Sequence, residues 1–223
     1  SDIYLIPKGE HKETMIFMHG LGDTAMGWLD AFADPDNGPC RSSTKVVLLT
    51  APTAKVSINF GMKMPSWYDI KSFVAKDFET KFEAVTGMDE VKENSARIKK
   101  VIEEEANILK GDYSKIYLGG FSQGASMSLY NGLSLNKKLG GIMAYSGYLF
   151  PVTEQSNENI KTPLFISHGK ADPLIPFEMS NKSYSTIDHD SHGTVKVHEE
   201  GLAHSISINI IKKSKEWFLK TCQ

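Results

Sequence analysis

The sequence has only two cysteines, Cys40 and Cys222, in 223 residues. They are too few for a disulfide framework or a zinc site. The chain also has no run of basic residues, and its formal net charge is −2, so we do not expect nucleic acid as a partner. Its apolar runs are far shorter than a membrane span, and no signal-peptide core is present. These absences predict a cytoplasmic protein.

Internal repeats, low-complexity tracts and linker-like stretches are absent as well. Hydrophobic residues make up 40% of the chain and charged residues 23%, which is ordinary for a globular protein with a substantial core. We therefore expect a single domain over residues 1–223.

Short apolar segments alternate along the chain with longer amphipathic ones. Several of the short segments are apolar on both faces, as in the strands of a largely parallel sheet covered by helices. We expect strands at 3–6, 14–20, 45–52, 115–120, 140–147, 162–169 and 194–200, and helices at 89–111, 122–135 and 205–220. The pattern predicts an α/β fold, with a mostly parallel central sheet and helices on both faces. Because ligands bind outside the carboxyl ends of such strands, functional residues should follow the strands directly.

The segment KIYLGGFSQGASMSLY, residues 115–130, places Ser122 between Gly120 and Gly124 where a strand meets a helix. A side chain at either glycine would collide with the adjacent strand or helix at so sharp a turn. The helix that follows directs its N-terminal amides toward charge that develops nearby. G-x-S-x-G alone is weak, because glycine and serine are common turn residues. The strand before it and the helix after it favour a nucleophile elbow.

A serine nucleophile needs a base, and the base needs a group that orients it. Of the seven histidines, His204 is the best placed, since it follows the last strand and directly precedes the last helix. The other histidines have ordinary interpretations. We expect solvated side chains in polar loops for His11, His189 and His192, a polar strand face for His198, and structural hydrogen bonds at strand ends for His19 and His168.

Among the acids, Asp172 directly follows the penultimate strand. Pro173 and Pro176 would stiffen its loop, which suits an acid that holds an imidazole in one tautomer. The alternative is an Asx turn before proline. Asp69 is a lesser candidate. The order serine, aspartate, histidine along the chain is that of α/β-hydrolases.

The segment FMHGLGD, residues 17–23, follows an early strand, where this fold carries its oxyanion loop. The backbone N–H of Leu21 could pair there with that of Gln123 to hold an oxyanion. The alternative is a glycine-rich turn before a helix that starts near Ala25. A dinucleotide or phosphate loop is disfavoured, because the Rossmann spacing and the P-loop lysine are both missing.

With FMHGLGDTAMGW, APT, MPSWYDI, GGFSQGASMSLY, SHGKADPLIP and GLAHS, the chain resembles the acyl-protein thioesterase family over nearly its whole length. These are small carboxylesterases and lysophospholipases of the α/β-hydrolase superfamily. Ala125 is a departure, because the family usually has a second glycine there, and its methyl group would crowd the site slightly. The resemblance implies Ser122 as nucleophile, His204 as base and then acid, Asp172 as orienting acid, and the Leu21 and Gln123 amides as oxyanion donors.

The acyl pocket is less clearly marked. Residues 55–82 are rich in apolar side chains but carry few helix or strand signals, so they either line a channel for a fatty chain or pack onto the core. Members of the family place a loop of this kind beside a hydrophobic acyl channel. We therefore expect Trp67, Leu174 and Met64 to form its wall, and methionine suits such an adaptable surface.

We predict hydrolysis of acyl thioesters or esters through an acyl-enzyme, without metal or organic cofactor, and with S-palmitoylated protein cysteines as the favoured substrates. The alternatives are a lysophospholipase or a broad short-chain carboxylesterase. A non-catalytic lipid-binding module is disfavoured by the complete triad, and a serine peptidase by the absence of a charged specificity residue. The oligomeric state is open. An exposed apolar rim would suit both a homodimer and transient contact with a membrane surface.

Overall fold

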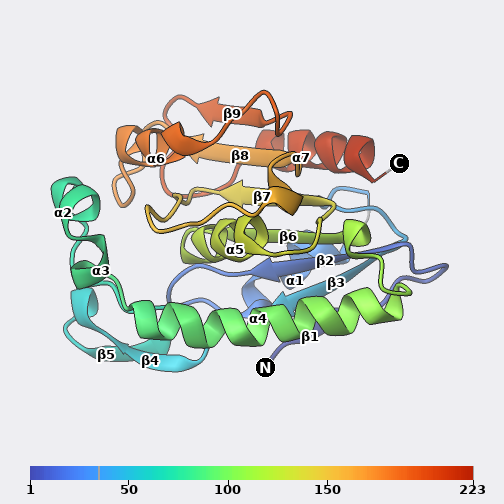
Figure 1. Ribbon diagram of the computed structural model, residues 1–223, viewed down its shortest axis with the longest axis horizontal. Coiled ribbons are helices and arrows are strands. Elements are labelled where there is room, and N and C mark those ends of the chain that lie inside the picture. Colours follow the sequence, from blue (N-terminus) through green and yellow to red (C-terminus); the bar gives the residue numbers. More distant parts are fainter. Residues whose placement is uncertain (35, 223) are drawn as a thin grey trace.

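The computed structural model describes residues 1–34 and 36–222. Within them, seven strands form one sheet in the order β1-β3-β2-β6-β7-β8-β9 (Figure 1). β1 runs antiparallel to β3, and the other neighbours are parallel, which confirms the predicted mostly parallel sheet. All seven predicted strands are present. Their bounds are β1 Ile3–Leu5, β2 Glu13–Met18, β3 Thr44–Leu49, β6 Ile116–Phe121, β7 Gly141–Tyr145, β8 Leu164–Gly169 and β9 Val195–Glu199.

Helices cover both faces of this sheet. Side chains alternate across each strand, so Ile16 and Met18 of β2 pack into one core cluster while Met15 and Phe17 pack into the other. The first cluster is covered by α4 (Met88–Ile108), α5 (Gln123–Ser134) and α6 (Phe177–Ser183), and the second by α1 (Leu29–Ala33) and α7 (Ile208–Thr221). The three predicted helices, now α4, α5 and α7, are confirmed. Short 3₁₀ turns are η1 Ala25–Trp28, η2 Ser57–Asn59, η3 Tyr113–Lys115, η4 Asn157–Asn159 and η5 Tyr184–Thr186.

Residues 53–85 form a region that the sequence did not resolve into elements. It consists of a hairpin, β4 (Thr53–Val56) with β5 (Met62–Pro65), followed by the short helices α2 (Ala75–Thr80) and α3 (Phe82–Val85), all at the left edge of Figure 1. The hairpin is a separate two-stranded sheet. Because most of its side chains are at least partly exposed, its strands lack the apolar alternation that predicted the other strands.

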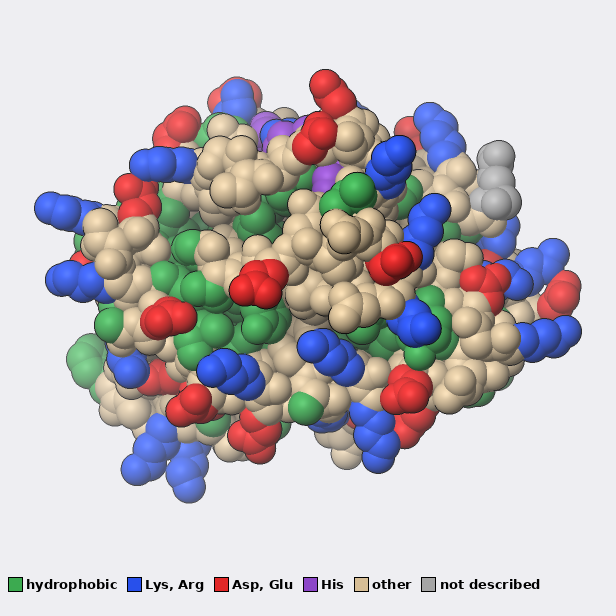
Figure 2. All heavy atoms as spheres, viewed as in Figure 1, with side chains coloured by type: hydrophobic (Ala, Val, Ile, Leu, Met, Phe, Trp, Pro, Cys, Tyr) green, Lys and Arg blue, Asp and Glu red, His purple; other side chains and the backbone are tan. Residues whose placement is uncertain are grey.

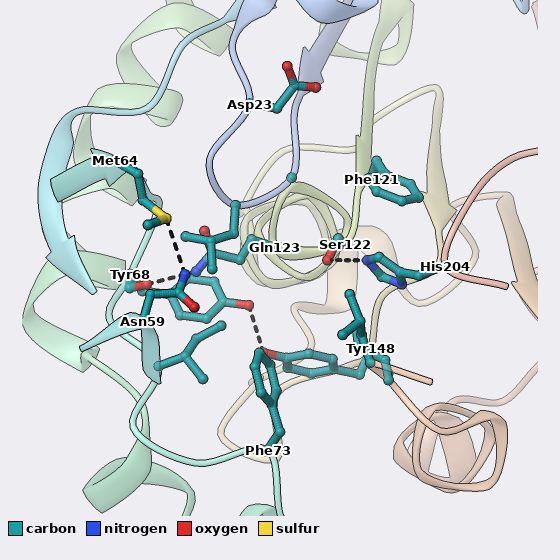
Figure 3. Close-up of a pocket in the computed structure, with 15 residues that line it drawn as sticks. Asp23, Asn59, Met64, Tyr68, Phe73, Phe121, Ser122, Gln123, Tyr148 and His204 are labelled. Atoms are coloured by element: carbon teal, nitrogen blue, oxygen red, sulfur yellow. Dashed lines mark hydrogen bonds between the residues drawn. The ribbon is translucent and has the colours of Figure 1, made fainter. Parts of the chain in front are cut away.

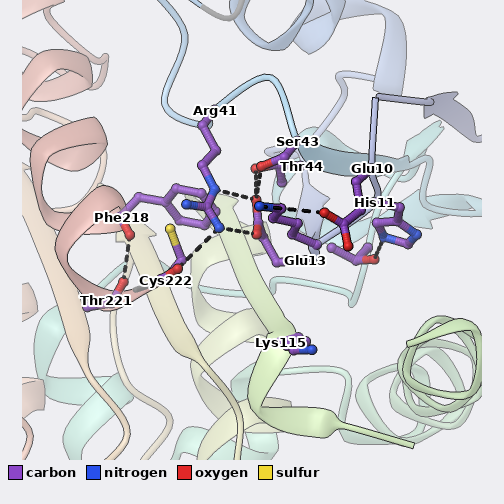
Figure 4. A network of polar contacts seen from close by, with 12 residues as sticks. Glu10, His11, Glu13, Arg41, Ser43, Thr44, Lys115, Phe218, Thr221 and Cys222 are labelled. Atoms are coloured by element: carbon purple, nitrogen blue, oxygen red, sulfur yellow. Dashed lines mark hydrogen bonds and ion pairs between the residues drawn. The ribbon is translucent and has the colours of Figure 1, made fainter. Parts of the chain in front are cut away.

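The amino end of β2 is held by a buried polar network around Glu13 (Figure 4). Arg41 donates to both carboxylate oxygens, at 2.9 and 2.6 Å, and Thr44 Oγ1 donates to Oε1 at 2.6 Å. Burial raises the pKa of Glu13, but the hydrogen bonds from Arg41 and Thr44 outweigh it and bring the pKa below its usual value. Arg41 also donates to the carbonyl of Cys222 at 3.1 Å and so fastens the end of α7 to the sheet.

Replacing Arg41 with methionine should therefore destabilise the fold without changing the chemistry at the opposite end of the strands. A buried carboxylate that loses its cation costs about 3 kcal/mol, which in a chain of this size lowers the melting temperature by roughly 6 to 12 °C. Thermal unfolding measures the loss. The double variant Arg41→Met with Glu13→Leu should recover part of it, because no charge is then left unpaired. A single variant as stable as the wild type would contradict this view of the network.

The parallel strands point toward the left of Figure 1, so their carboxyl ends gather at one edge of the sheet. Four residues from the sequence analysis follow strands on this edge: His19 directly after β2, Ser122 directly after β6, Asp172 in the loop after β8 and His204 in the loop after β9. This edge carries the site. Within the described part of the chain, no helix is both long and apolar enough to cross a membrane.

Candidate functional site

Ser122 occupies a strained turn between β6 and α5. Its φ of 55° and ψ of −118° lie in a region that residues with a side chain rarely adopt. Its own N–H donates to Tyr145 O at 2.9 Å, which fixes the turn against β7. A Cβ at Gly120 would lie 2.2 Å from the backbone of Gly124, and one at Gly124 would lie 2.0 Å from Met18 O. The predicted steric need for both glycines is confirmed.

The serine, the histidine and the aspartate meet in a hydrogen-bonded line (Figure 3 shows the first pair). His204 Nε2 lies 2.9 Å from Ser122 Oγ, and His204 Nδ1 lies 2.6 Å from Asp172 Oδ2. Asp172 lies in the loop after β8, and His204 lies in the loop after β9. These two loops approach closely because residue 169 is glycine, where a Cβ would come within 2.1 Å of Leu202 O. With Nδ1–H given to the carboxylate, Nε2 is free to accept the serine proton.

Both oxygens of the Asp172 carboxylate accept hydrogen bonds. Oδ1 accepts the backbone N–H groups of Leu174 and Ile175, both at 2.9 Å. Oδ2 accepts from His204 and also lies 3.3 Å from Nε2 of His168. Burial raises the pKa of Asp172, but the hydrogen bonds from His168, His204 and the Ile175 amide outweigh it and hold the pKa well below its usual value. The carboxylate is therefore charged at neutral pH.

The loop after β2 is shaped by His19. Its Nδ1 donates to Gly20 O at 2.6 Å and its Nε2 accepts from Ala51 N at 3.0 Å. Burial lowers the pKa of His19, which keeps Nε2 available as an acceptor. Because the Gly20 carbonyl and the Leu21 N–H belong to one planar peptide and point in opposite directions, this bond turns the Leu21 N–H away from the histidine. Among the described residues, neither Leu21 N nor Gln123 N donates a hydrogen bond.

Beside the serine lies a cavity of about 320 Å³. Met64 and Leu174 line it, as predicted. Trp67 does not, and that prediction is wrong: its side chain is 0% exposed and its Nε1 donates to His19 O at 2.8 Å, so it braces the loop after β2 from behind. The remaining wall is mostly apolar and aromatic. It is formed by Gly20, Leu21, Asp23, Asn59, Tyr68, Ile70, Phe73, Phe121, Gln123, Tyr148 and Ile175, with Ser122 and His204 (Figure 3).

The sequence did not predict two residues of the cavity wall, Tyr68 and Tyr148, because neither has a clear functional signal of its own. Tyr68 and Tyr148 share a hydrogen bond of 2.7 Å between their hydroxyl groups and so join the segment before α2 to the loop after β7. Burial raises the pKa of both phenols, which keeps them neutral. The strand-end rule that located the triad also applied to Tyr148, in SGYLF, but a tyrosine there carries no motif of its own.

The side chain of Gln123 has a role that only the structure reveals. Its Oε1 accepts from Trp67 N at 3.0 Å and its Nε2 donates to Tyr68 O at 2.7 Å. The residue after the serine thus ties the cavity wall to the elbow. Ala125 is accommodated because residue 147 is glycine, where a Cβ would lie 2.5 Å from the Ala125 methyl group.

Other candidates fall outside the site. Asp69 accepts from Ser57 N and Oγ and closes the turn after β4. His192, which we expected to be solvated, is buried, and its Nδ1 lies 2.7 Å from Thr162 O. Its loop folds back onto the segment before β8, a long-range contact that local polarity does not reveal.

Comparisons with known proteins agree with this geometry. Residues 5–223 match the model of the family described as Phospholipase/Carboxylesterase. An acyl-protein thioesterase 1 from Yarrowia lipolytica is 34% identical over 94% of this chain and 92% of its own. An acyl-protein thioesterase 1 homolog from Dictyostelium discoideum is 33% identical over 95% and 91%.

Solved structures show the same fold. The crystal structure of Zea mays acyl-protein thioesterase 2 superposes with a TM-score of 0.80, at 21% identity, over 100% of this chain and 99% of its own. A Bacillus cereus carboxylesterase gives 0.76, at 17% identity, over 99% and 93%. The chain belongs to the phospholipase/carboxylesterase family of hydrolases, which has the α/β-hydrolase fold.

Proposed function

We propose that this hydrolase cleaves acyl thioesters and esters with Ser122 as nucleophile, and that S-acylated protein cysteines are its favoured substrates. The observation that carries the proposal is the pair of hydrogen bonds that link Ser122 Oγ, His204 and Asp172, at 2.9 and 2.6 Å. A lone serine hydroxyl is a weak nucleophile, and such a line is what activates it.

The proposed reaction has two matched halves. His204 Nε2 takes the Ser122 proton as Oγ attacks the carbonyl carbon, and the imidazolium then gives that proton to the leaving thiolate or alkoxide. Asp172 keeps Nδ1–H in place and stabilises the imidazolium. Water, activated in the same way, attacks the acyl-enzyme and releases the fatty acid and the free serine.

The oxyanion would be held by the backbone N–H groups of Leu21 and Gln123. Both residues line the cavity next to Ser122, and neither amide is used elsewhere in the described chain. Gln123 is also the first residue of α5, whose positive dipole end faces the same point. Each donor of this kind contributes about 3 kcal/mol to lowering the barrier.

The cavity supports an acyl group as the part of the substrate that is bound. Its wall is mostly apolar, with Met64, Phe73, Leu174 and Ile175 among the lining residues. Asp23 is the only acid that lines it, and the described lining includes no lysine or arginine that would pair with a phosphate. This favours a thioester or simple ester over a lysophospholipid. Relatives named acyl-protein thioesterase support the same choice.

Substrates of this class sit at membranes, and the β4–β5 hairpin is the best candidate for transient contact with a lipid surface. Phe60 at its turn is 96% exposed and Met62 is 57% exposed. Lys55 and Lys63 face each other on its strands and are exposed, which suits anionic headgroups. Figure 2 shows positive and negative side chains mixed over the face that it displays, so this face has no basic patch that would serve as an alternative membrane-binding surface.

Replacing Phe60 with serine should weaken binding to vesicles of phosphatidylcholine and phosphatidylserine by about tenfold, because the variant no longer buries an aromatic ring in the lipid. Co-sedimentation measures the binding, and Phe60→Leu is the matched control that keeps an apolar side chain. Turnover of a water-soluble ester should not change. Equal binding by the serine variant and the wild type would contradict this role. A dimer that Phe60→Ser dissociates, detected by light scattering, would instead assign the hairpin to a homodimer.

The experiment that tests the function compares three substrates: a palmitoylated peptide thioester, lysophosphatidylcholine and short p-nitrophenyl esters. We expect the highest kcat/KM on the thioester, and labelling of the protein by a fluorophosphonate. Failure to label under native conditions would contradict the hydrolase proposal in this form. Higher turnover of lysophosphatidylcholine would leave the proposed triad in place but would make lysophospholipids the favoured substrates.

A further inference from the structure

Beside the proposed triad lies a second histidine, which the mechanism above does not use. His168, on β8, is only 2% exposed. Its Nε2 lies 2.8 Å from Ile175 O and 3.3 Å from Asp172 Oδ2. A carbonyl oxygen only accepts hydrogen bonds, so Nε2 carries the hydrogen, and this N–H lies between two acceptors.

The other ring nitrogen does not account for a histidine at this position. Nδ1 of His168 is buried and has no hydrogen-bond partner among the described residues. A buried polar atom without a partner destabilises the fold, and a leucine of similar size would avoid that cost. The reason for a histidine at this position is therefore the hydrogen bond that its Nε2 donates.

That bond closes a ring of contacts around the carboxylate. Ile175 donates its N–H to Asp172 Oδ1 at 2.9 Å, and its carbonyl accepts from His168. The backbone of Ile175 is thus held at both ends, and His168 joins it to β8. Without the His168 N–H, the Ile175 carbonyl loses this donor, and Oδ2 keeps only His204.

We propose that His168 is a positioning residue, which through Asp172 and Ile175 holds the carboxylate at the angle that His204 requires. The proposal rests on the triad of the proposed function. It predicts an effect on kcat, because His168 touches neither the cavity nor the serine. An imidazole whose partner is free to rotate spends less time aimed at Ser122 Oγ, and a misplacement of about 1 Å costs up to 100-fold in rate.

Two substitutions and one control test this. His168→Leu removes the donor and keeps the volume. His168→Gln keeps an amide nitrogen near the place of Nε2, with two N–H groups for the two acceptors. His198→Leu is the matched control, since His198 is the register partner of His168 on β9 and contacts no member of the triad.

The assay uses p-nitrophenyl acetate, with active sites counted by fluorophosphonate titration so that only folded, competent protein enters kcat. We expect His168→Leu to lower kcat by about 10- to 100-fold with KM within about twofold, and His168→Gln to stay within about threefold of the wild type. His198→Leu should match the wild type.

Three results would overturn the proposal. Titrated His168→Leu sites that turn over at the wild-type rate would make His168 purely structural. A loss of kcat in His168→Gln as large as that in His168→Leu would mean that the hydrogen-bond donor is not what matters. An equal loss in the His198→Leu control would mean that the effect is not specific to His168. Failure of the proposed function would look different, because the wild type itself would then show neither titration nor turnover.

Discussion

Ser122→Ala should abolish hydrolysis, with kcat lowered by roughly 10⁴- to 10⁶-fold on every ester and thioester. The methyl group that replaces Oγ cannot attack a carbonyl, and His204 Nε2 then has no proton to take. Alanine is smaller than serine and keeps the same backbone, so the elbow and the cavity should remain. The residual rate over water would come from binding and from the oxyanion donors alone.

Steady-state assays on p-nitrophenyl butyrate and a palmitoyl thioester measure this loss, together with fluorophosphonate labelling, which should disappear. Ser134→Ala is the matched control. This serine ends the same helix, and its Oγ donates to Tyr130 O at 2.6 Å, away from the cavity. A Ser122→Ala variant with a tenth of the wild-type activity, free of contaminating esterase, would remove Ser122 from the role of nucleophile.

The sequence located the three polar residues of the site because of one physical regularity. Parallel strands end at the same edge of the sheet, so a serine after β6, an aspartate after β8 and a histidine after β9 converge although they lie far apart along the chain. β6 and β8 were recognisable because both their faces are buried, whereas β9 is buried only at Val197. Order along the chain and position at strand ends were therefore enough to bring Ser122, Asp172 and His204 together.

The wall of the cavity could not be located in this way. Trp67 and Tyr68 are neighbours in a motif, yet Trp67 lies behind the loop after β2 while Tyr68 lines the cavity. Which way each side chain points depends on Gln123, whose buried amide fixes the backbone between them. Such a contact spans more than fifty residues and leaves no periodic trace in the sequence.

His19 and His168, both buried, show the same limit at closer range. Both were expected to make structural hydrogen bonds, and both do, with Gly20 O and Ile175 O. What the sequence could not show is the position of each bond, one on the peptide that carries the Leu21 N–H and the other beside the carboxylate of Asp172. A structural hydrogen bond placed there also shapes the site.

Asp172→Asn should lower kcat by about 10⁴-fold at neutral pH while leaving the fold in place. The wild-type carboxylate accepts hydrogen bonds from the amides of Leu174 and Ile175 on Oδ1 and from the ring of His204 on Oδ2, and the His168 ring lies 3.3 Å from Oδ2. Asparagine offers one oxygen and one NH₂ group. When its oxygen keeps the two backbone amides, the NH₂ group faces the rings as a donor, and His204 Nδ1 must become an acceptor.

The hydrogen of His204 then moves to Nε2, which can no longer take the Ser122 proton, so the loss comes from the wrong tautomer and not from a missing contact. Nitrogen-15 NMR of the imidazole reports the tautomer, and kcat measured on titrated sites reports the loss. Asp188→Asn is the matched control, since Asp188 accepts from Ser191 in an exposed turn and should tolerate the change. Because its hydrogen bonds keep the pKa of Asp172 well below its usual value, this carboxylate stays charged down to strongly acidic pH. An asparagine variant with wild-type kcat would mean that His204 needs no charged partner to act as a base.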